Sequence, residues 1–224
     1  MAALVVFIAN WLPNWRNVVA DNSPVINLAF TGASGAQYGL RLLQCLVAHG
    51  CWVNVMVSKA AQVVIATETE FRLPGSKPAM VEAFTDYAKA KPGQVQVFGR
   101  EEWFSPPASG SGEKAPLVIC PCSTGTLSAL ATGASNNLIE RAGDVALKER
   151  RKLILVLRET PYSEVHLENM LKLTRMGAVI MPASPGFYHN PQSLDDLVDF
   201  MVARILDHLD LPQTLVPRWG ESAD

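Results

Sequence analysis

The chain is short of charge. Of its 224 residues, 18% are charged and 49% are hydrophobic, whereas an average soluble domain carries about 25% charged residues. The scarcity is either accidental or a sign that part of the surface is buried against other subunits, and we favour burial. A net charge of −2 leaves no basic excess to neutralise the phosphates of a nucleic acid. The apolar content is also too high for a disordered chain.

Cysteine and histidine are scarce as well, at four residues each. The cysteines lie in or beside apolar runs, and the spacing of Cys120 and Cys122 differs from the C-x-x-C of redox and zinc sites. No histidine stands three or four residues from another. We therefore expect no metal site. Buried free thiols indicate a reducing compartment, which predicts a cytoplasmic protein.

The N-terminal region lacks an apolar run long enough to cross a membrane. Residues 1–9 are apolar, but a membrane-spanning helix needs about 18–20 such residues. The basic segment that opens a signal peptide is also missing. We expect residues 1–23 to form a mobile N-terminal extension. Residues 24–224 are expected to form one domain that does not bind membranes.

From Pro24 onward, short apolar runs alternate with helical patterns. The expected strands are Val25–Phe30, Trp52–Val57, Val95–Phe98, Leu117–Cys120, Leu153–Leu157 and Ala178–Met181. The expected helices are Ala36–His49, Ser58 or Lys59 to about Thr69, Pro78 to about Lys91, Thr124–Thr132, Asn137–Arg150, Glu164–Met176 and Leu194–Leu209. Strands that are apolar throughout and separated by helices are typical of a parallel sheet covered on both faces. The sequence therefore predicts a single α/β domain with a doubly wound, Rossmann-like or flavodoxin-like, mainly parallel sheet.

A glycine-rich segment, Thr31-Gly32-Ala33-Ser34-Gly35, follows the first expected strand. In a doubly wound sheet, ligands bind beyond the carboxyl ends of the strands. The glycines let the backbone approach a ligand, and the next helix offers free N–H groups to a phosphate, so we expect a phosphate or flavin site here. No Gly-Lys-Ser/Thr follows, which excludes a Walker loop. A nicotinamide site is disfavoured because the second strand ends in Ser58-Lys59, without an acidic residue for a ribose.

Hydroxyl side chains follow two further strands. Ser58 ends one of them, and Ser123-Thr124-Gly125-Thr126 come after the run that includes Pro121 and Cys122. A helix cap explains one hydroxyl per helix. Four small polar residues in a row instead predict an anion cradle built from neutral donors, which suits a mononucleotide such as FMN.

Charged and aromatic side chains follow the later strands. Arg158 and Glu159 come directly after an apolar strand. A cation at that edge is placed to bind an anion, and the carboxylate beside it is a candidate acid–base. Tyr188 lies in a Gly- and Pro-rich loop after the last strand, where functional residues are common. Lys148 stands at a helix end, where a cation by itself indicates only a solvated terminus.

An acidic motif, Asp195-Asp196-Leu197-Val198-Asp199, matches the DDxxD that holds magnesium on prenyl diphosphates. A metal site of that kind needs a second acidic cluster, and none is evident. Ser193 precedes the motif as an expected N-cap, and acids in a first turn complement the helix dipole. We therefore interpret the motif as structural.

Taken together, several segments closely resemble the flavin prenyltransferase family of UbiX type. They are TGASGAQYGLRLL, SKAAQ with ATETE, CPCSTGTLS, NNLIERAGDVALKERR, LRETPYSEVHLENM and GFYHNPQSLDDLVDFMVARILD. The resemblance implies alkylation of reduced FMN by dimethylallyl monophosphate without a metal, with a fourth ring closed between flavin N5 and C6. The product is the prenylated FMN that UbiD-type decarboxylases use. The resemblance also implies a homododecamer with active sites at subunit junctions.

Roles for individual residues follow from the same resemblance. The implied FMN-binding residues are Gly32, Ala33, Ser34, Ser58, Ser123, Thr124, Gly125, Thr126 and Arg158. The implied residues of the dimethylallyl phosphate site are Tyr188, Arg204, Lys148, Glu68 and Trp219. Of these, Glu68, Arg204 and Trp219 come from the resemblance alone, because nothing else in the sequence distinguishes them.

The resemblance implies a catalytic set of Glu159, Ser34, Lys148, Tyr188 and Arg158. Its cations would stabilise the departing phosphate, Glu159 would move protons between phosphate and flavin, and Ser34 would assist near N5. Two alternatives stay open: an FMN-dependent decarboxylase acting directly on an aromatic acid, and a non-catalytic FMN carrier. Related cysteine-peptide decarboxylases use a histidine early in the second helical region. The helix after the glycine-rich segment has only His49, at its far end.

Overall fold

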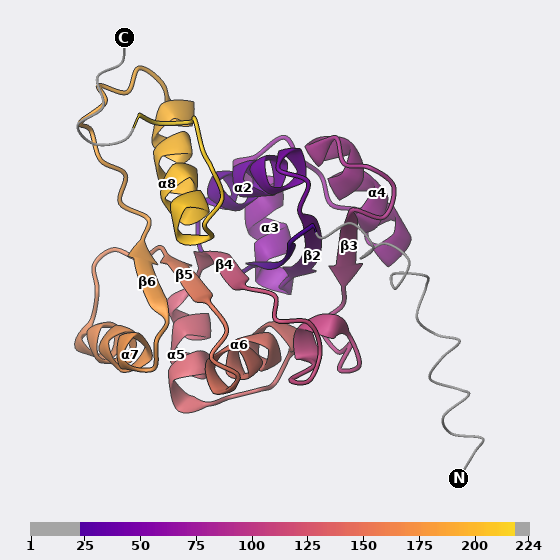
Figure 1. Ribbon diagram of the computed structural model, residues 1–224. Helices are drawn as coiled ribbons and strands as arrows, with labels where there is room; N and C mark the ends of the chain where they lie inside the picture. Colours follow the sequence, from indigo (N-terminus) through magenta and orange to yellow (C-terminus); the bar gives the residue numbers. More distant parts are fainter. Residues whose placement is uncertain (1–22, 218–224) are drawn as a thin grey trace.

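A parallel sheet forms the centre of the molecule (Figure 1). The computed structural model describes residues 23–217; Trp219 and residues 1–22 of the expected extension lie outside this range. The strands are β1 (Val25–Phe30), β2 (Trp52–Val57), β3 (Val95–Phe98), β4 (Leu117–Cys122), β5 (Leu153–Leu157) and β6 (Val179–Pro182). Their order is β3-β2-β1-β4-β5-β6, and every neighbouring pair is parallel. The doubly wound α/β fold expected from the alternating pattern is confirmed.

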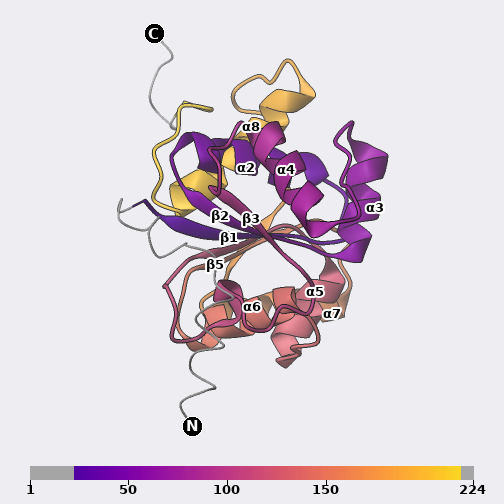
Figure 2. The ribbon, with the colours of Figure 1, turned by 90° about the vertical axis from the view of Figure 1, so that its right-hand side faces the viewer.

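Helices cover both faces of the sheet (Figure 2). One face carries α2 (Ala36–Ala48), α3 (Lys59–Glu68), α4 (Lys77–Ala88) and α8 (Leu194–His208). The other carries α5 (Thr124–Thr132), α6 (Leu138–Lys148) and α7 (Glu164–Arg175). Each face has its own apolar core, because strands that are buried on both sides send alternate side chains to opposite layers.

Helix α4 and strand β4 end at other residues than the sequence predicts. Helix α4 ends at Ala88 rather than near Lys91, because Lys89 adopts a left-handed conformation (φ 54°) that stops the helix before the proline does. Strand β4 continues to Cys122 rather than ending at Cys120. A register shift after Ile119 lets Cys122 pair with Leu157 of β5, so the strand passes through Pro121.

A buried pair of amides joins the first two strands. Asn27 of β1 stands opposite Asn54 of β2, and Asn54 Nδ2 donates to Asn27 Oδ1 at 2.9 Å. Both residues are buried within otherwise apolar strands. Each amide therefore depends on the other for this hydrogen bond, since a buried polar group without a partner is costly.

All four cysteines are buried and unpaired. Burial raises the pKa of Cys51 to about 11 and that of Cys122 to about 12. These two thiols are therefore protonated and unreactive at neutral pH. Among residues 23–217, the helices are all too short or too polar to cross a membrane.

Candidate functional site

The strand order places a topological switch point between β1 and β4. From there the chain winds outward through β2 and β3 on one side, and through β5 and β6 on the other. The loops after β1 and β4 therefore diverge at the carboxyl edge of the sheet and leave a crevice, which is where doubly wound sheets bind ligands. The Gly-rich segment 31–35 and the hydroxyl segment 123–126 both stand at this point.

Thr31 ties these two loops together. Its hydroxyl donates to the carbonyl oxygen of Pro121 at 2.7 Å and accepts from the backbone N–H of Ser123 at 2.8 Å. The residue is buried, so both bonds are shielded from water. The threonine that begins the Gly-rich segment thus fixes the distance between the two walls of the crevice.

The N-terminus of α2 is capped by a distant carboxylate. Gly35 is the N-cap residue and adopts a left-handed conformation (φ 102°) that favours glycine, and its own position supplies no side-chain cap. Instead, Glu68 at the end of α3 accepts from the backbone N–H groups of Gly35 (2.8 Å) and Ala36 (3.2 Å). The Gly35 and Ala36 N–H groups, for which the sequence predicts a phosphate or flavin, therefore bind a carboxylate of the chain itself.

Glu68 is held in its ionised form. Burial raises its pKa, but hydrogen bonds from the Ser34 side chain and from the Gly35 and Ala36 backbone, with the charge of Arg158, lower it by more. The net result is a pKa below the ordinary value for a glutamate. Ser34, Glu68 and Arg158 therefore form one electrostatically connected group at the crevice.

Arg158 and Glu159 lie on the β4 side of the crevice. The Arg158 backbone N–H donates to Cys122 O (3.2 Å), which continues the β4–β5 pairing. The Glu159 carboxylate accepts from the Thr124 hydroxyl at 3.2 Å and from the Thr160 backbone N–H at 3.1 Å. We call Ser34, Glu68, Thr124, Arg158 and Glu159 the carboxyl-edge cluster.

The carboxyl-edge cluster contains an unsatisfied donor. The Nε atom of Arg158 is buried and has no hydrogen-bond partner among the described residues. Buried polar groups are nearly always paired, and leaving a charged one unpaired is especially costly. The residue is therefore suited to an anionic or hydrogen-bond-accepting ligand in the crevice.

Ser58 and Gly32 shape the β2 side of the crevice. Ser58 caps α3 by accepting from the Ala61 backbone N–H at 3.1 Å, and it borders a hollow of about 240 Å³ that Lys59 and Arg100 also line. A Cβ at Gly32 would stand 2.6 Å from the Cβ of Ala60, so only glycine allows this approach of the loop to α3. In the same way Ser123 caps α5 by accepting from the Thr126 backbone N–H at 3.3 Å. The hydroxyls of Ser58 and Ser123 thus have structural roles as well as a place at the crevice.

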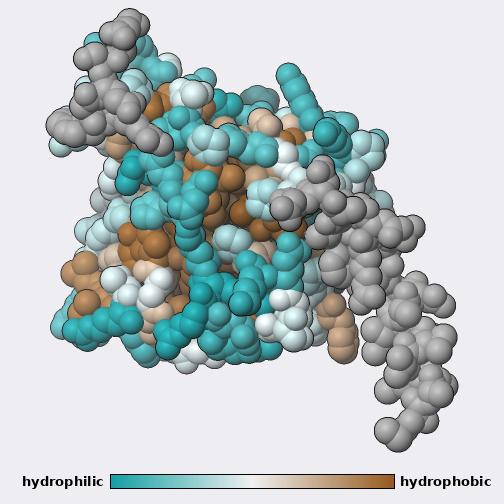
Figure 3. Space-filling view, in the orientation of Figure 1, coloured by the Kyte–Doolittle hydropathy of each residue, from teal (hydrophilic) through white to brown (hydrophobic). Residues whose placement is uncertain are grey.

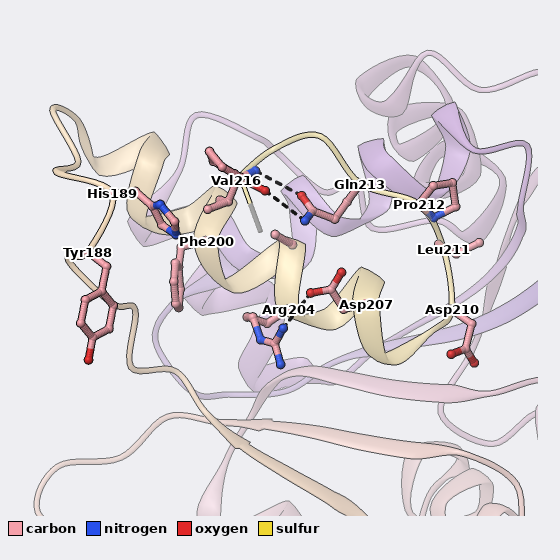
Figure 4. A pocket seen from close by; sticks show the side chains of 12 residues that line it. Tyr188, His189, Phe200, Arg204, Asp207, Asp210, Leu211, Pro212, Gln213 and Val216 are labelled. Carbon is pink, nitrogen blue, oxygen red and sulfur yellow. Dashed lines mark hydrogen bonds and ion pairs between the residues drawn. The ribbon is translucent and has the colours of Figure 1, made fainter. Parts of the chain in front are cut away.

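Tyr188 and Arg204 meet in a different place, a cavity of about 820 Å³ beside α8 (Figure 4). The cavity is bounded by the loop before α8, by α8 itself and by the segment after it, and Asp207 and Asp210 also line it. In Figure 4 the Tyr188 and Arg204 side chains point in the same direction. No member of the carboxyl-edge cluster lines this α8 cavity.

Lys148 lies apart from both groups. It is the last residue of α6 and precedes β5, whereas Arg158 follows β5, so the two stand at opposite edges of the sheet. Its ammonium pairs with Glu149, and it approaches Gly110 in the loop before β4. The structure therefore brings the expected site residues together in two groups and leaves Lys148 outside them, while Trp219 lies beyond the described residues.

Two acids of the DDxxD motif, Asp196 and Asp199, have structural partners. Asp196 accepts from the backbone N–H groups of Gln192 (2.7 Å) and Ser193 (3.0 Å) as part of a capping box at the start of α8. Asp199 forms a two-point ion pair with Arg41 of α2, at 2.6 and 3.1 Å. These contacts support the structural interpretation of the motif.

Comparisons with known proteins agree with one another. A family model described as flavoprotein matches residues 16–206. The flavin prenyltransferase UbiX of Pseudomonas aeruginosa is 65% identical over 88% of this chain and 94% of its own. The crystal structure of AnUbiX (PadA1) in complex with FMN and dimethylallyl pyrophosphate has a TM-score of 0.79 at 39% identity, covering 89% of this chain and 99% of that one. A dodecameric FMN-dependent UbiX-like decarboxylase from Escherichia coli O157:H7 has a TM-score of 0.78 at 35% identity, covering 88% and 100%.

Proposed function

Because this chain belongs to the flavin prenyltransferase family of UbiX type, we propose that it transfers a dimethylallyl group from dimethylallyl monophosphate to N5 and C6 of reduced FMN. The observation that carries the proposal is the carboxyl-edge cluster. It places a buried, unpaired guanidinium nitrogen, two carboxylates and two hydroxyls at the switch point of a doubly wound sheet. The product, prenylated FMN, would pass to a UbiD-type decarboxylase.

The crevice residues fit FMN. The residues that would hold it are Gly32, Ala33, Ser34, Ser58, Ser123, Thr124, Gly125, Thr126 and Arg158. They surround the N-terminal ends of α2, α3 and α5. At α3 and α5, backbone N–H groups and hydroxyls suit a phosphate and the polar edge of a flavin, whereas the Gly35 and Ala36 N–H groups of α2 are taken by Glu68. The unpaired Nε of Arg158 provides one donor for this purpose. Reduced FMN supplies the nucleophilic N5 of the reaction.

Cations of this chain would assist the departure of phosphate. The allylic C–O bond breaks with its electron pair on the phosphate oxygen, so positive charge close to that oxygen lowers the barrier. Arg158, Arg204 and Lys148 are the proposed sources of this charge, with the Tyr188 hydroxyl as a further donor. Fixed cations can supply such stabilisation without a metal ion.

Proton movements are assigned to Glu159 and Ser34 of the carboxyl-edge cluster. Glu159 accepts a hydrogen bond from Thr124 and is proposed to move a proton between phosphate and flavin. Ser34 lies against the ionised Glu68, so its hydroxyl has an acceptor for its own proton. Ser34 is proposed to act near N5 through this contact.

Association of subunits would unite the separated groups. Val165, Leu167 and Leu171 of α7 are each more than half exposed, and Figure 3 shows apolar atoms on the lower left of the molecule, where Figure 1 places α7. Large exposed apolar side chains that gather on one face favour burial in an interface. We propose a homododecamer in which Lys148 and the α8 cavity complete the flavin site of neighbouring subunits. The unpaired buried thiols support a cytoplasmic location.

One experiment separates this activity from its alternatives. The pure protein is mixed with reduced FMN and dimethylallyl monophosphate without oxygen, and phosphate release and flavin mass are followed. Release of phosphate with a flavin heavier by one isoprene unit is the expected result. Binding of both ligands without turnover would instead identify a carrier. In a parallel reaction with an added aromatic acid in place of dimethylallyl monophosphate, release of carbon dioxide would identify a decarboxylase.

Replacement of Glu159 by glutamine tests the proton-transfer assignment. E159Q should retain FMN, because the amide still accepts a hydrogen bond from Thr124, but ring closure should slow by about a hundredfold or more, the usual loss with an acid–base group. Glu164→Gln, in the exposed first turn of α7, is the matched control and should leave the rate unchanged. Equal single-turnover rates for E159Q and the unmodified protein would remove Glu159 from the mechanism.

A further inference from the structure

The charges of the α8 cavity are already paired within the chain. Arg204 Nη1 lies 2.7 Å from Asp207 Oδ2, and both side chains line the cavity (Figure 4). Asp210, which also lines it, lies 2.6 Å from Lys152 Nζ. A phosphate entering the cavity therefore meets a guanidinium that already has a carboxylate partner.

Asp207 competes with any anion that Arg204 binds. A carboxylate within hydrogen-bond distance of the guanidinium occupies part of its donor surface and repels a second anion at the same group. The pair joins positions i and i+3 of one helix, and both side chains are partly exposed. An ion pair of this kind is weak and is easily exchanged, so phosphate can displace the carboxylate and be displaced by it.

The hydrogen bond of the Asp207 side chain joins two residues of one helix rather than two elements of the fold. The contrast is Asp199, eight residues earlier on the same α8, which binds Arg41 of α2 through two oxygens and joins the two helices. Within residues 23–217, the hydrogen-bond partner of the Asp207 carboxylate is Arg204 of its own helix, bound through one oxygen. The ion pair of Asp207 therefore affects the charge and orientation of the Arg204 side chain rather than the packing of α8 against other elements.

We propose that Asp207 is a positioning residue that binds Arg204 between turnovers and lowers the affinity of the α8 cavity for phosphate, so that the orthophosphate product leaves. The inference rests on the proposed function, because it needs Arg204 to bind the phosphate of the allylic substrate. It adds a release step: the carboxylate returns to the guanidinium as orthophosphate departs.

The test is product inhibition by orthophosphate in the steady-state reaction of the full oligomer. D207N should lower the inhibition constant of orthophosphate and the KM for dimethylallyl monophosphate by about two- to fivefold, the range expected for removing one exposed competing charge. The kcat should stay equal or fall, because release becomes slower. D207E should restore the original constants. D199N, the matched control, should lower thermal stability and leave the inhibition constant unchanged.

Arg204→Gln distinguishes failure of this inference from failure of the proposed function. If R204Q leaves both constants unchanged, the assignment of Arg204 as a phosphate ligand is wrong. If R204Q raises both while D207N leaves them unchanged or raises them, the phosphate assignment stands and the role of Asp207 is overturned.

Discussion

At the scale of single residues, the capping of α2 by Glu68 is the most consequential contact of the site. A carboxylate from the end of α3 occupies the N–H groups that a phosphate or other ligand anion would use. The same carboxylate accepts a hydrogen bond from the Ser34 side chain and interacts electrostatically with Arg158. Because one side chain serves helix stability and the crevice together, its removal should affect both.

Glu68→Gln should therefore make the protein less stable and less sensitive to acid. The folded-state pKa of Glu68 lies below its ordinary value, so its ionised form stabilises the fold at neutral pH. This contribution is lost as the pH falls through the folded-state pKa. E68Q should lose about 1 kcal/mol at pH 7, as for other lost helix caps, and the difference should shrink in acid.

Urea unfolding at pH 7 and at pH 3 measures both effects. Glu70→Gln, two residues further on and exposed, is the control and should match the unmodified protein. A pH-independent difference between E68Q and the unmodified protein would contradict the assigned ionisation.

Residue-scale prediction from sequence succeeded where local chemistry is distinctive. The Gly-rich segment, the hydroxyls after β4 and the Arg158–Glu159 pair were expected at the carboxyl edge, and they lie there. Glu68 and Arg204 have no such local signal, because each looks like an ordinary polar residue of a helix surface. Tertiary folding brings Glu68 to its partners, and Arg204 meets its partner one helical turn away. A hydrophobic period in the sequence does not distinguish such polar residues from ones that are simply exposed to solvent.

At the scale of elements, the crevice depends on how closely α2 approaches the sheet. A Cβ at Gly39 would stand 2.3 Å from Cys120 O and 2.5 Å from the Phe30 ring. Both neighbours belong to the strands that end at the switch point. The third glycine of the TGASGxxxG pattern thus serves helix–strand packing, while Gly35 serves the turn.

Gly39→Ala should lower the free energy of unfolding by about 1–3 kcal/mol or more, the usual cost of overpacking a core. It should also weaken FMN binding, because the Gly-rich segment leads directly into α2 and would shift with it. Gly75→Ala is the control, since a Cβ there meets nothing within 4 Å. Thermal unfolding and flavin titration of both variants test the prediction, and an unaffected melting temperature in G39A would refute it.

Most elements could be located from sequence because their apolar periods and caps are strong. The exceptions have local causes. Lys89 adopts a left-handed backbone conformation that ends α4 and that no residue pattern predicts. Strand β4 is two residues longer than expected because its register against β5 shifts. Such details depend on neighbouring strands and so are invisible to a single-segment pattern.

At the scale of the whole molecule, the proposed site is divided among three places. The carboxyl-edge cluster, the α8 cavity and Lys148 stand apart within one chain. The low charge of the sequence suits the proposed association of subunits, but composition does not identify which surfaces would meet. Contacts between chains leave no periodic trace in the sequence of one chain.

Shared sites predict that two inactive variants can rescue each other. K148A and E159Q should each be inactive as pure oligomers. Co-expressed oligomers should recover up to about a quarter of normal activity, because random mixing gives that share of junctions two intact contributions. Activity of tagged mixed oligomers measures this, with separately purified and then combined proteins as the unmixed control. Absence of rescue would place Lys148 and Glu159 in one subunit's site or remove Lys148 from it.

The buried Asn27–Asn54 pair acts as an alignment check on the sheet. If β2 slid by two residues along β1, every apolar side chain would keep its face, so hydrophobic patterning alone could not detect the error. The slide would leave both buried amides without their hydrogen-bond partner, and the free-energy cost of an unsatisfied buried polar group disfavours it. The Gly-rich segment follows β1 and Ser58 follows β2. The register that this hydrogen bond favours therefore also sets the relative height of the two loops at the carboxyl edge.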